Sequence, residues 1–338
     1  MLEVGFFISL LLISIFANKF GSKIQRGVDR VQNIRKKHEA RVGGILIFTF
    51  VCVLGIQKQH HEMLLVCLFF IPALIPAVVE DFFHRHDVGP RVIGSGLSAI
   101  LISAFFIIGS EQSLIFELGL GHIILLLALT GFCFFSIHSF NLIDGMDGLA
   151  SGYFCLSVLF LINIMPAPLA EETAGIGLSL LLITTTFFCF NFLFSRVLLG
   201  DMGAYFLGYL FFVMLMILAA NIDFELLLVA LFVVFFPFYE VIRTIVRRIC
   251  ARVKITDPDR LHLHSILFEG WINAGVSVTV SNKLTTIALL ALFGGHLAIL
   301  YEFRNVNFAP FAVTGSAILM YEGMYYLIRN FIKSSKDI

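Results

Sequence analysis

The feature that most constrains this sequence is a series of eleven apolar stretches spread along the whole chain. They lie near residues 2–18, 43–57, 63–79, 92–109, 119–137, 149–165, 173–194, 203–220, 222–241, 284–302 and 308–331. A helix needs about 20 mostly apolar residues to cross a bilayer, so the shorter stretches imply tilt or a locally thin membrane. Spanning β-strands would alternate apolar and polar residues, which residues 226–238 do not do. The sequence therefore predicts an all-α, polytopic integral membrane protein with about eleven transmembrane helices.

The composition agrees with a membrane protein and excludes two other classes. Only 14% of the residues are charged, against roughly a quarter in soluble domains. A chain that is 59% hydrophobic is also unlike a disordered one. Since no internal repeat or low-complexity linker is visible, we expect a single transmembrane domain over residues 1–338. The longest polar stretch, 242–283, is expected to be a cytoplasmic loop.

Lys and Arg are distributed very unevenly between the predicted loops. All but two of the 23 Lys and Arg residues fall on one side of the membrane, and the exceptions are Lys58 and Arg304. Because basic loops stay in the cytoplasm, the N-terminus is predicted to be periplasmic and the C-terminus cytoplasmic. Glu3 before the first stretch, and the basic cluster after it, favour its retention over cleavage as a signal peptide.

The acidic, amide and histidine clusters all fall on the predicted cytoplasmic side. They are Glu80 with Asp81, then Asn141 with Asp144 and Asp147, then Asp201, and finally His262 with His264. The topology was predicted from the basic residues alone, without use of these clusters. Their location on one face is therefore independent support for an active site at the cytoplasmic surface.

Each cluster also has a structural interpretation. Glu80 and Asp81 could be a solvated helix end, although carboxylates at a helix C-terminus oppose the helix dipole. The two Asp-Gly pairs at 144–145 and 147–148 could be ordinary turns, and Asp201 could be a helix N-cap.

The two histidines of the last loop could simply be solvated. His262 and His264 would point in different directions in a helix and to one side in an extended segment. A common target for the two rings therefore predicts extended or loop backbone there.

Carboxylates and an amide suggest a site for a hard cation. Mg²⁺ prefers oxygen ligands and commonly joins one or two protein groups to substrate phosphates. Nearby arginines suit phosphate oxygens, although cytoplasmic topology alone explains most of them. The residue types by themselves therefore support Mg²⁺-dependent phosphoryl chemistry at the inner membrane face.

Five motifs, in this order, resemble those of the polyprenyl-phosphate N-acetylhexosamine-1-phosphate transferases. This family includes phospho-MurNAc-pentapeptide translocase and bacterial initiators of O-antigen (lipopolysaccharide), enterobacterial common antigen and teichoic acid synthesis. The motifs are residues 35–44 with His38 and Arg41, the pair Glu80-Asp81, the Asn-x-x-Asp-Gly-x-Asp-Gly-Leu motif at 141–149, Asn191 with the Gly-Asp-x-Gly motif at 200–203, and residues 258–264 with Arg260, His262 and His264. The resemblance covers nearly the whole chain.

The resemblance implies a reaction. The phosphate of undecaprenyl phosphate would attack the sugar-bearing phosphorus of a UDP-N-acetylhexosamine, releasing UMP and leaving a lipid-linked sugar for a cell-surface polysaccharide. It implies a location in the bacterial inner membrane and no nucleic-acid partner. The cofactor would be Mg²⁺, with Mn²⁺ as an alternative, and a homodimer is left open.

The resemblance also implies roles for single residues. Asn141 and Asp201 would hold the metal. Asp81, with Glu80, would position or deprotonate the lipid phosphate, and Asp144 would be the third catalytic residue, shaping the nucleotide–sugar pocket with Asp147. The remaining substrate-binding positions implied are His38, Arg41, Asn191, Arg260, His262 and His264.

The sequence departs from the family pattern at several of these motifs. Glu80 replaces an Asp, His138 an Asn, Ser265 a His, Glu240 an Asp, Phe194 a Pro and Ala204 a Ser. A reduced rate or a variant sugar donor could follow from Glu80, whose arm is one carbon longer.

Two alternatives remain open at the level of sequence. One is a phospho-MurNAc-pentapeptide transferase of peptidoglycan synthesis. The other is a membrane transporter of lipid-linked or nucleotide sugars, which would place ionisable groups near the bilayer midplane. His296 and Glu322 are such groups, and we expect them to be packed against bonded partners.

Overall fold

The structure, a computed structural model, describes residues 5–12, 40–83, 87–110, 119–254, 259 and 261–336. These residues form helices, joined by short turns and one isolated parallel bridge between Ala40 and Val197. The predicted site residues His38 and Arg260 lie outside the described residues.

Twelve labelled helices follow one another along the described chain. They are α2 (Gly43–Gln57), α3 (His61–Phe83), α4 (Val88–Ser110), α5 (Leu120–Ile143), α6 (Leu149–Ile164), α7 (Ala167–Phe194), α8 (Gly200–Ala219), α9 (Phe224–Phe232), α10 (Phe235–Ala251), α11 (Leu263–Asn273), α12 (Val278–Glu302) and α13 (Ala309–Lys336). A further short helix covers residues 5–12. The all-α prediction is confirmed for the part of the chain that the structure describes.

The predicted number of membrane-crossing helices is only partly supported. Among the described residues, six helices are long and apolar enough to cross a membrane, or seven if α9 and α10 form one bent span. Helix α2 has only 15 residues, which gives about 22 Å at the usual rise per residue, less than the roughly 30 Å of a hydrocarbon core. Every predicted span falls on a helix or a helix pair, but the count of about eleven is not confirmed.

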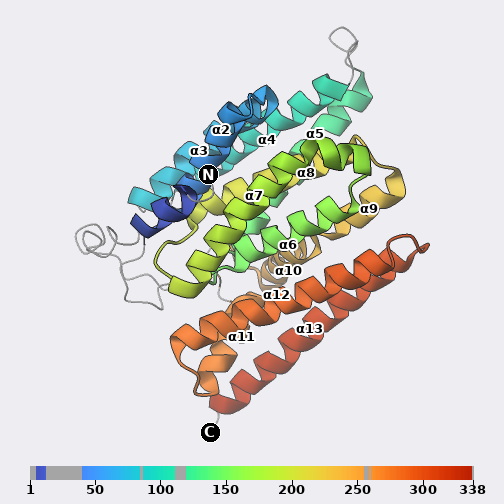
Figure 1. Cartoon of the computed structure of the whole chain (residues 1–338). Helices are drawn as coiled ribbons and strands as arrows, with labels where there is room; N and C mark the ends of the chain where they lie inside the picture. The colour runs from blue at the N-terminus through green and yellow to red at the C-terminus, as the bar shows by residue number, and fades with distance from the viewer. Residues whose placement is uncertain are drawn as a thin grey trace.

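Helix α8 lies at the centre of the bundle. It packs against α2, α3 and α5, and most of its residues are buried. Figure 1 shows α2, α3 and α4 on one side of α8 and the long antiparallel pair α12 and α13 on the other. The central position of α8 brings its first turn, which carries Asp201, within reach of several loops.

Helices α2 and α8 cross at two glycines. A Cβ atom added to Gly44 would lie 2.2 Å from the backbone nitrogen of Gly203. Only glycine allows the two backbones to come this close, so any larger residue at position 44 would push the start of α2 away from the start of α8.

The bend between α9 and α10 follows from Pro237. The two helices meet at 63°. Proline has no N–H and its ring clashes with the carbonyl four residues earlier, which here belongs to Val233. The hydroxyl of Tyr153 on α6 donates to that carbonyl, so the oxygen freed by the break has a buried partner.

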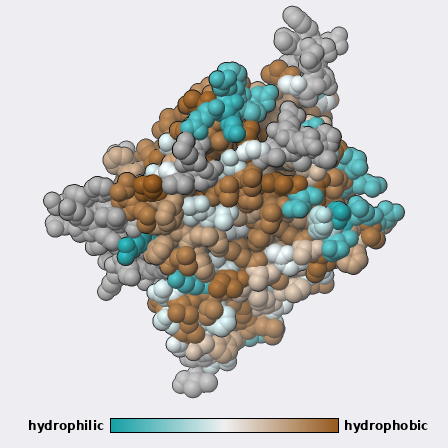
Figure 2. Space-filling model, in the orientation of Figure 1, coloured by the Kyte–Doolittle hydropathy of each residue, from teal (hydrophilic) through white to brown (hydrophobic). Residues whose placement is uncertain are grey.

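The outer surface is largely apolar. Leu127 on α5 is 67% exposed, and other large apolar side chains project from α3 and α4. Figure 2 shows polar residues confined to a few patches of an otherwise hydrophobic face. Such a surface fits lipid rather than water.

The predicted cytoplasmic stretch 242–283 is more regular than expected. It holds the second half of α10, all of α11 and the start of α12. Helix α10 is amphipathic and its last turn carries Arg248, so the basic character that suggested a loop is one face of a helix.

Candidate active site at the cytoplasmic loops

Asp81 lies where α3 reaches the first turn of α8. Its Oδ1 accepts from the backbone N–H of Asp201 and its Oδ2 from that of Met202, both at 3.0 Å. A carboxylate at a helix N-terminus satisfies free amides and faces the positive end of the helix dipole. Asp81 thus fixes the start of the helix that carries Asp201.

Gly200 makes this arrangement possible. Its φ is +78°, a backbone conformation that favours glycine. A Cβ atom there would lie 2.6 Å from Oδ2 of Asp81, so a side chain would displace the carboxylate as well as strain the backbone.

The solvated-helix-end interpretation of the Glu80-Asp81 pair is wrong. Glu80 is 3% exposed and Asp81 is 6% exposed. Buried carboxylates need charged or hydrogen-bonded partners, and Asp81 has two backbone amides and the Arg41 guanidinium, whose Nη1 lies 3.7 Å from Oδ1.

Asp201 has a charged partner of its own. Arg91, near the start of α4, donates from Nη1 to Oδ2 of Asp201 at 2.9 Å. Both side chains stay partly accessible, at 18% for Arg91 and 20% for Asp201. The predicted metal ligand is therefore paired with an arginine and open to solvent at the same time.

The segment before α2 is joined to the segment before α8 by backbone hydrogen bonds. Gly43 N–H donates to Leu198 O and Gly44 N–H to Leu199 O, each at 2.9 Å. These bonds place Arg41 beside the Asp81–Asp201 contact.

Asn141 and Asp144 end α5 and begin the turn toward α6. Asn141 is in the last turn of α5 and Asp144 is its C-cap, and both residues are half-buried. Removal of the carboxyl group from water, followed by the charge of Asp201, raises the pKa of Asp144 to about 8, although Arg41 acts in the opposite direction. Asp144 is therefore close enough to Asp201 and Arg41 to sense their charges.

Asp147 is held inside the protein. Its Oδ2 accepts from the Ser195 hydroxyl at 2.5 Å, while its backbone N–H donates to Asn282 and its carbonyl accepts from Thr286. Asp147 as a whole residue is 6% exposed. These contacts connect the loop after α5 to the end of α7 and to α12.

Asn191 has a similar cross-linking position. Its Oδ1 accepts from Gly148 N–H at 2.6 Å and its Nδ2 donates to Val197 O at 2.7 Å. Both functions of the amide are used by the backbone, so Asn191 positions two loops relative to each other.

His262 and His264 form a stacked pair. Their ring planes differ by 12° and their centroids lie 5.4 Å apart. His262 has extended backbone as the N-cap of α11, whereas His264 is already in the helix. The predicted common orientation is observed, and only the first of the two residues needs extended backbone.

Glu240 on α10 supports this pair. Its Oε1 accepts from Leu263 N–H at 2.9 Å, and its Oε2 lies 3.4 Å from His262 Nδ1. Burial, together with the nearby His262, lowers the pKa of His264 to about 4, so this imidazole is neutral at pH 7.

His264 packs directly on the Asp144 turn. A Cβ atom on Gly145 would lie 2.2 Å from His264 Nε2. His264 Nδ1 has no hydrogen-bond partner among the described residues. The last motif of the chain is thereby brought onto the Asn141–Leu149 motif, more than 100 residues earlier.

Several known proteins are similar in sequence to this chain. Residues 63–219 match the family model for glycosyl transferase family 4. A probable undecaprenyl-phosphate N-acetylglucosaminyl 1-phosphate transferase of Bacillus subtilis is 28% identical, over 82% of this chain and 80% of its own. An undecaprenyl-phosphate alpha-N-acetylglucosaminyl 1-phosphate transferase of Thermotoga maritima is 26% identical over 78% of each chain.

A third relative is the phospho-N-acetylmuramoyl-pentapeptide-transferase of Prochlorococcus marinus, which is 24% identical over 61% of this chain and 65% of its own. The chain is thus similar to glycosyl transferase family 4 in its central part and to these transferases over most of its length. With its span-like helices and bacterial relatives, the chain is a multi-pass bacterial membrane protein.

The predicted site residues of the chain divide into two groups. Asp201, Arg41, Asn141 and Asp144 are partly accessible. The others that the structure describes are buried: Glu80, Asp81, Asp147, Asn191, His262 and His264.

Sequence reasoning missed four positioning residues. Arg91 pairs with the side chain of Asp201, Ser195 pairs with the side chain of Asp147, and Asn282 pairs with the backbone of Asp147. Glu240 was noticed only as a departure from the family. Of the four, Arg91 was the residue that the sequence could have indicated. It is a basic residue at the edge of an apolar stretch, ten residues after the acidic pair that ends with Asp81.

The oxygen donors of the predicted site are of the kind that suits Mg²⁺ or Mn²⁺. Among the described residues, no group of three or more His, Cys, Asp or Glu side chains is arranged to bind a metal. Asn141 and Asp201 offer oxygen atoms only, and Mg²⁺ commonly needs just one or two protein carboxylates together with substrate phosphates.

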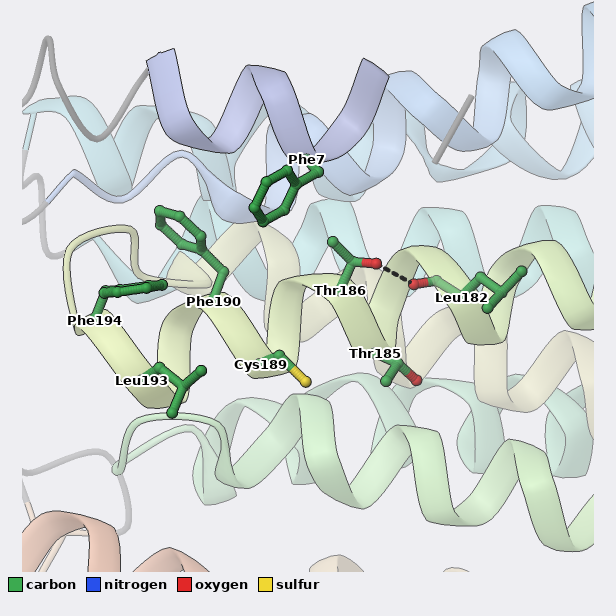
Figure 3. Close-up of a pocket in the computed structure, with 8 residues that line it drawn as sticks. All are labelled: Phe7, Leu182, Thr185, Thr186, Cys189, Phe190, Leu193 and Phe194. Atoms are coloured by element: carbon green, nitrogen blue, oxygen red, sulfur yellow. Dashed lines mark hydrogen bonds between the residues drawn. The ribbon is translucent and has the colours of Figure 1, made fainter. Parts of the chain in front are cut away.

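An apolar pocket of about 280 Å³ lies on α7, away from the carboxylates. Figure 3 shows Phe7 facing Phe190 and Thr186 across it. Its wall includes Phe194, the residue before Ser195. The pocket thus begins next to the loop that holds Asp147.

Glu322 has the bonded partners that we expected. It accepts from Arg243 at 2.6 Å and from the Tyr239 hydroxyl at 2.8 Å. His296 is buried at 5% exposure and packs against Phe235 and Phe293.

Proposed function

We propose that this chain belongs to glycosyl transferase family 4 and is a phosphotransferase that moves a sugar-1-phosphate from a UDP-N-acetylhexosamine to undecaprenyl phosphate. UMP is released, and the product is the first lipid-linked intermediate of a cell-surface polysaccharide. The relatives in Bacillus subtilis and Thermotoga maritima, whose names give this acceptor and N-acetylglucosamine, support GlcNAc as the sugar.

The observation that carries the proposal is the contact between Asp81 and the first turn of α8. It joins two motifs that are 120 residues apart and places Asp201 beside Arg41 and Arg91. Carboxylates with arginines at one membrane face are suited to a metal-bound diphosphate and a lipid phosphate. Positioning and charge neutralisation are what phosphoryl transfer chiefly requires.

Asn141 and Asp201 are the residues that we propose for Mg²⁺. When bound, Mg²⁺ would neutralise charge on the donor diphosphate. Asp81 orients the helix that carries Asp201, and Arg41 is available to phosphate oxygens. His264, which is neutral at pH 7, would present an imidazole edge to the donor next to the Asp144 turn.

The location of the polar groups supports an enzyme over a transporter. A transporter is expected to hold ionisable groups near the membrane midplane between repeated halves. Here the carboxylates of the predicted site lie at the loop ends of α3, α5 and α8. We further propose a periplasmic N-terminus, a cytoplasmic C-terminus and a location in the inner membrane.

A donor panel tests the function. Purified protein, Mg²⁺ and undecaprenyl phosphate are mixed with UDP-GlcNAc, with UDP-6-deoxy-N-acetylhexosamines or with UDP-MurNAc-pentapeptide, and UMP is measured. Release from UDP-GlcNAc is expected. Release from UDP-MurNAc-pentapeptide alone would favour the alternative suggested by the relative in Prochlorococcus marinus. Uptake of a UDP-sugar into sealed vesicles without UMP would replace the enzyme with a transporter.

A further inference from the structure

Asp201 is a partly accessible carboxylate of the site, yet an arginine already neutralises it. Arg91 Nη1 lies 2.9 Å from Oδ2, the geometry of a charge-assisted hydrogen bond. A divalent cation on the same carboxylate would meet the positive charge of the guanidinium at close range. The two cannot share Asp201 at full strength, because like charges repel strongly in a partly desolvated site.

The surroundings of Arg91 give it an alternative orientation. Its side chain is 18% exposed, so the guanidinium reaches solvent where a donor would enter. Arg91 occupies the first turn of α4, so only the side chain has to move. An anionic group bound beside Asp201 would offer the guanidinium a new partner.

We propose that Arg91 competes with the cation for Asp201, so that the metal binds tightly only together with the donor diphosphate. Without a bound cation, Arg91 would neutralise Asp201 through the contact that the structure shows. When the donor and the metal arrive together, the carboxylate turns to the metal and the guanidinium to a phosphate oxygen. This exchange rests on the proposed function, and it makes metal and donor binding mutually reinforcing.

The proposal has a direct consequence for the free protein. Replacing Arg91 by a neutral residue removes the competitor, so the metal should bind more tightly without donor, whereas the donor should bind less tightly. If Arg91 only positioned Asp201, replacing Arg91 would misplace the Asp201 carboxylate, and the metal should then bind less tightly.

The experiment measures Mn²⁺ binding by electron paramagnetic resonance in detergent, without donor, for the wild type, Arg91→Gln, Arg91→Lys and Arg304→Gln. Arg304→Gln is the control for the loss of one arginine, since Arg304 contacts Tyr301 and lies on the other predicted side. Arg91→Gln should bind Mn²⁺ about 10-fold more tightly. Arg91→Lys keeps the charge and should stay close to the wild type, as should Arg304→Gln.

A second arm adds UDP-GlcNAc. Addition of the nucleotide sugar should tighten Mn²⁺ binding to the wild type and change it little in Arg91→Gln, whose KM for the donor should rise. Unchanged or weaker Mn²⁺ binding by Arg91→Gln in the absence of donor would overturn the proposal. If Arg91→Gln does not fold, Arg91→Met keeps the length of the side chain and has the same expected outcomes. The donor-free arm is independent of sugar transfer, so failure of the donor panel would leave it interpretable.

Discussion

Asp81→Asn is the substitution that most directly tests how the site is built. The two oxygens of Asp81 each accept one backbone N–H of α8 at 3.0 Å. An Asn side chain has one acceptor oxygen and one NH₂ group, so one of the two amides would face a donor instead of an acceptor. The variant also loses the negative charge at the helix N-terminus and the attraction to Arg41.

The expected loss of stability can be estimated from these contacts. A buried donor left without an acceptor costs about 1–3 kcal/mol, and a charge at a helix N-terminus contributes about 0.3–1 kcal/mol. Together they give roughly 1–4 kcal/mol, which corresponds to a fall in melting temperature of about 2–6 °C for a chain of 338 residues. Because the first turn of α8 also carries Asp201, we expect UMP release to fall by about 100-fold.

Thermal unfolding in detergent and UMP release should be measured on the same preparations, beside Glu80→Gln and Glu80→Asp. Glu80→Gln leaves both amide contacts of Asp81 in place and should melt close to the wild type. Glu80→Asp restores the usual family pair and should be tolerated or faster. An Asp81→Asn protein with wild-type melting would refute the capping role, and one with wild-type turnover beside an inactive Glu80→Gln would reverse the two assignments.

Three further predictions concern the topology, the histidine pair and its protonation. Cysteines introduced at Lys58 and Lys254 should differ in accessibility to an impermeant thiol reagent in sealed vesicles, and equal labelling would contradict the orientation. Gly145→Ala should displace His264, because the new Cβ would lie 2.2 Å from Nε2, and should lower kcat/KM by at least about 10-fold. The control is Gly96→Ala, which should keep its activity because its Cβ meets nothing within 4 Å. The pKa of His264 is about 4 in the folded protein, against 6.5 ordinarily. Between these pH values the unfolded state therefore binds more protons than the folded state. The free energy of unfolding should fall by up to about 3 kcal/mol as the pH falls from about 6.5 to 4. Melting temperatures at pH 7.5 and 5 should therefore differ less for His264→Gln than for the wild type, and an equal difference would place the titration elsewhere.

The helices were predictable because apolar length is a local property of the sequence. Each predicted span coincides with a helix or helix pair. The number of spans was less predictable, since α2 and α6 are short and the apolar stretch 222–241 is bent at Pro237. A proline in an apolar run shows where a helix can break, but the partner that stabilises the break, Tyr153, is 80 residues away.

The location of the polar clusters was predictable for a similar reason. Topology alone places the loops at 80–91, 138–148 and 195–203 on one side of the membrane, and the structure brings them together. The roles within the site were harder to predict, because they depend on which side chain binds which backbone. Asp147 and Asn191 were expected to bind substrate, and in the structure the Asp147 side chain accepts from Ser195 while the Asn191 amide bonds to two backbone groups.

These contacts share one design. Asp81 binds the start of α8, Asn191 binds the turn after α5, and Glu240 binds the start of α11, each through a side chain from another part of the chain. Buried polar groups that satisfy backbone amides fix geometry, because their loss leaves those amides unpaired. A motif residue used in this way can be essential without touching a ligand.

The same distinction indicates which residues remain for ligands. A buried side chain that already bonds backbone groups has less capacity left for a phosphate or a cation. Asn141 and Asp144 are half-buried and Asp201 is partly open. Arg41 and Arg91 reach solvent with 23% and 18% of their side chains. Substitutions in this accessible group should therefore change KM and metal dependence first, whereas those in the buried group should change stability and kcat together.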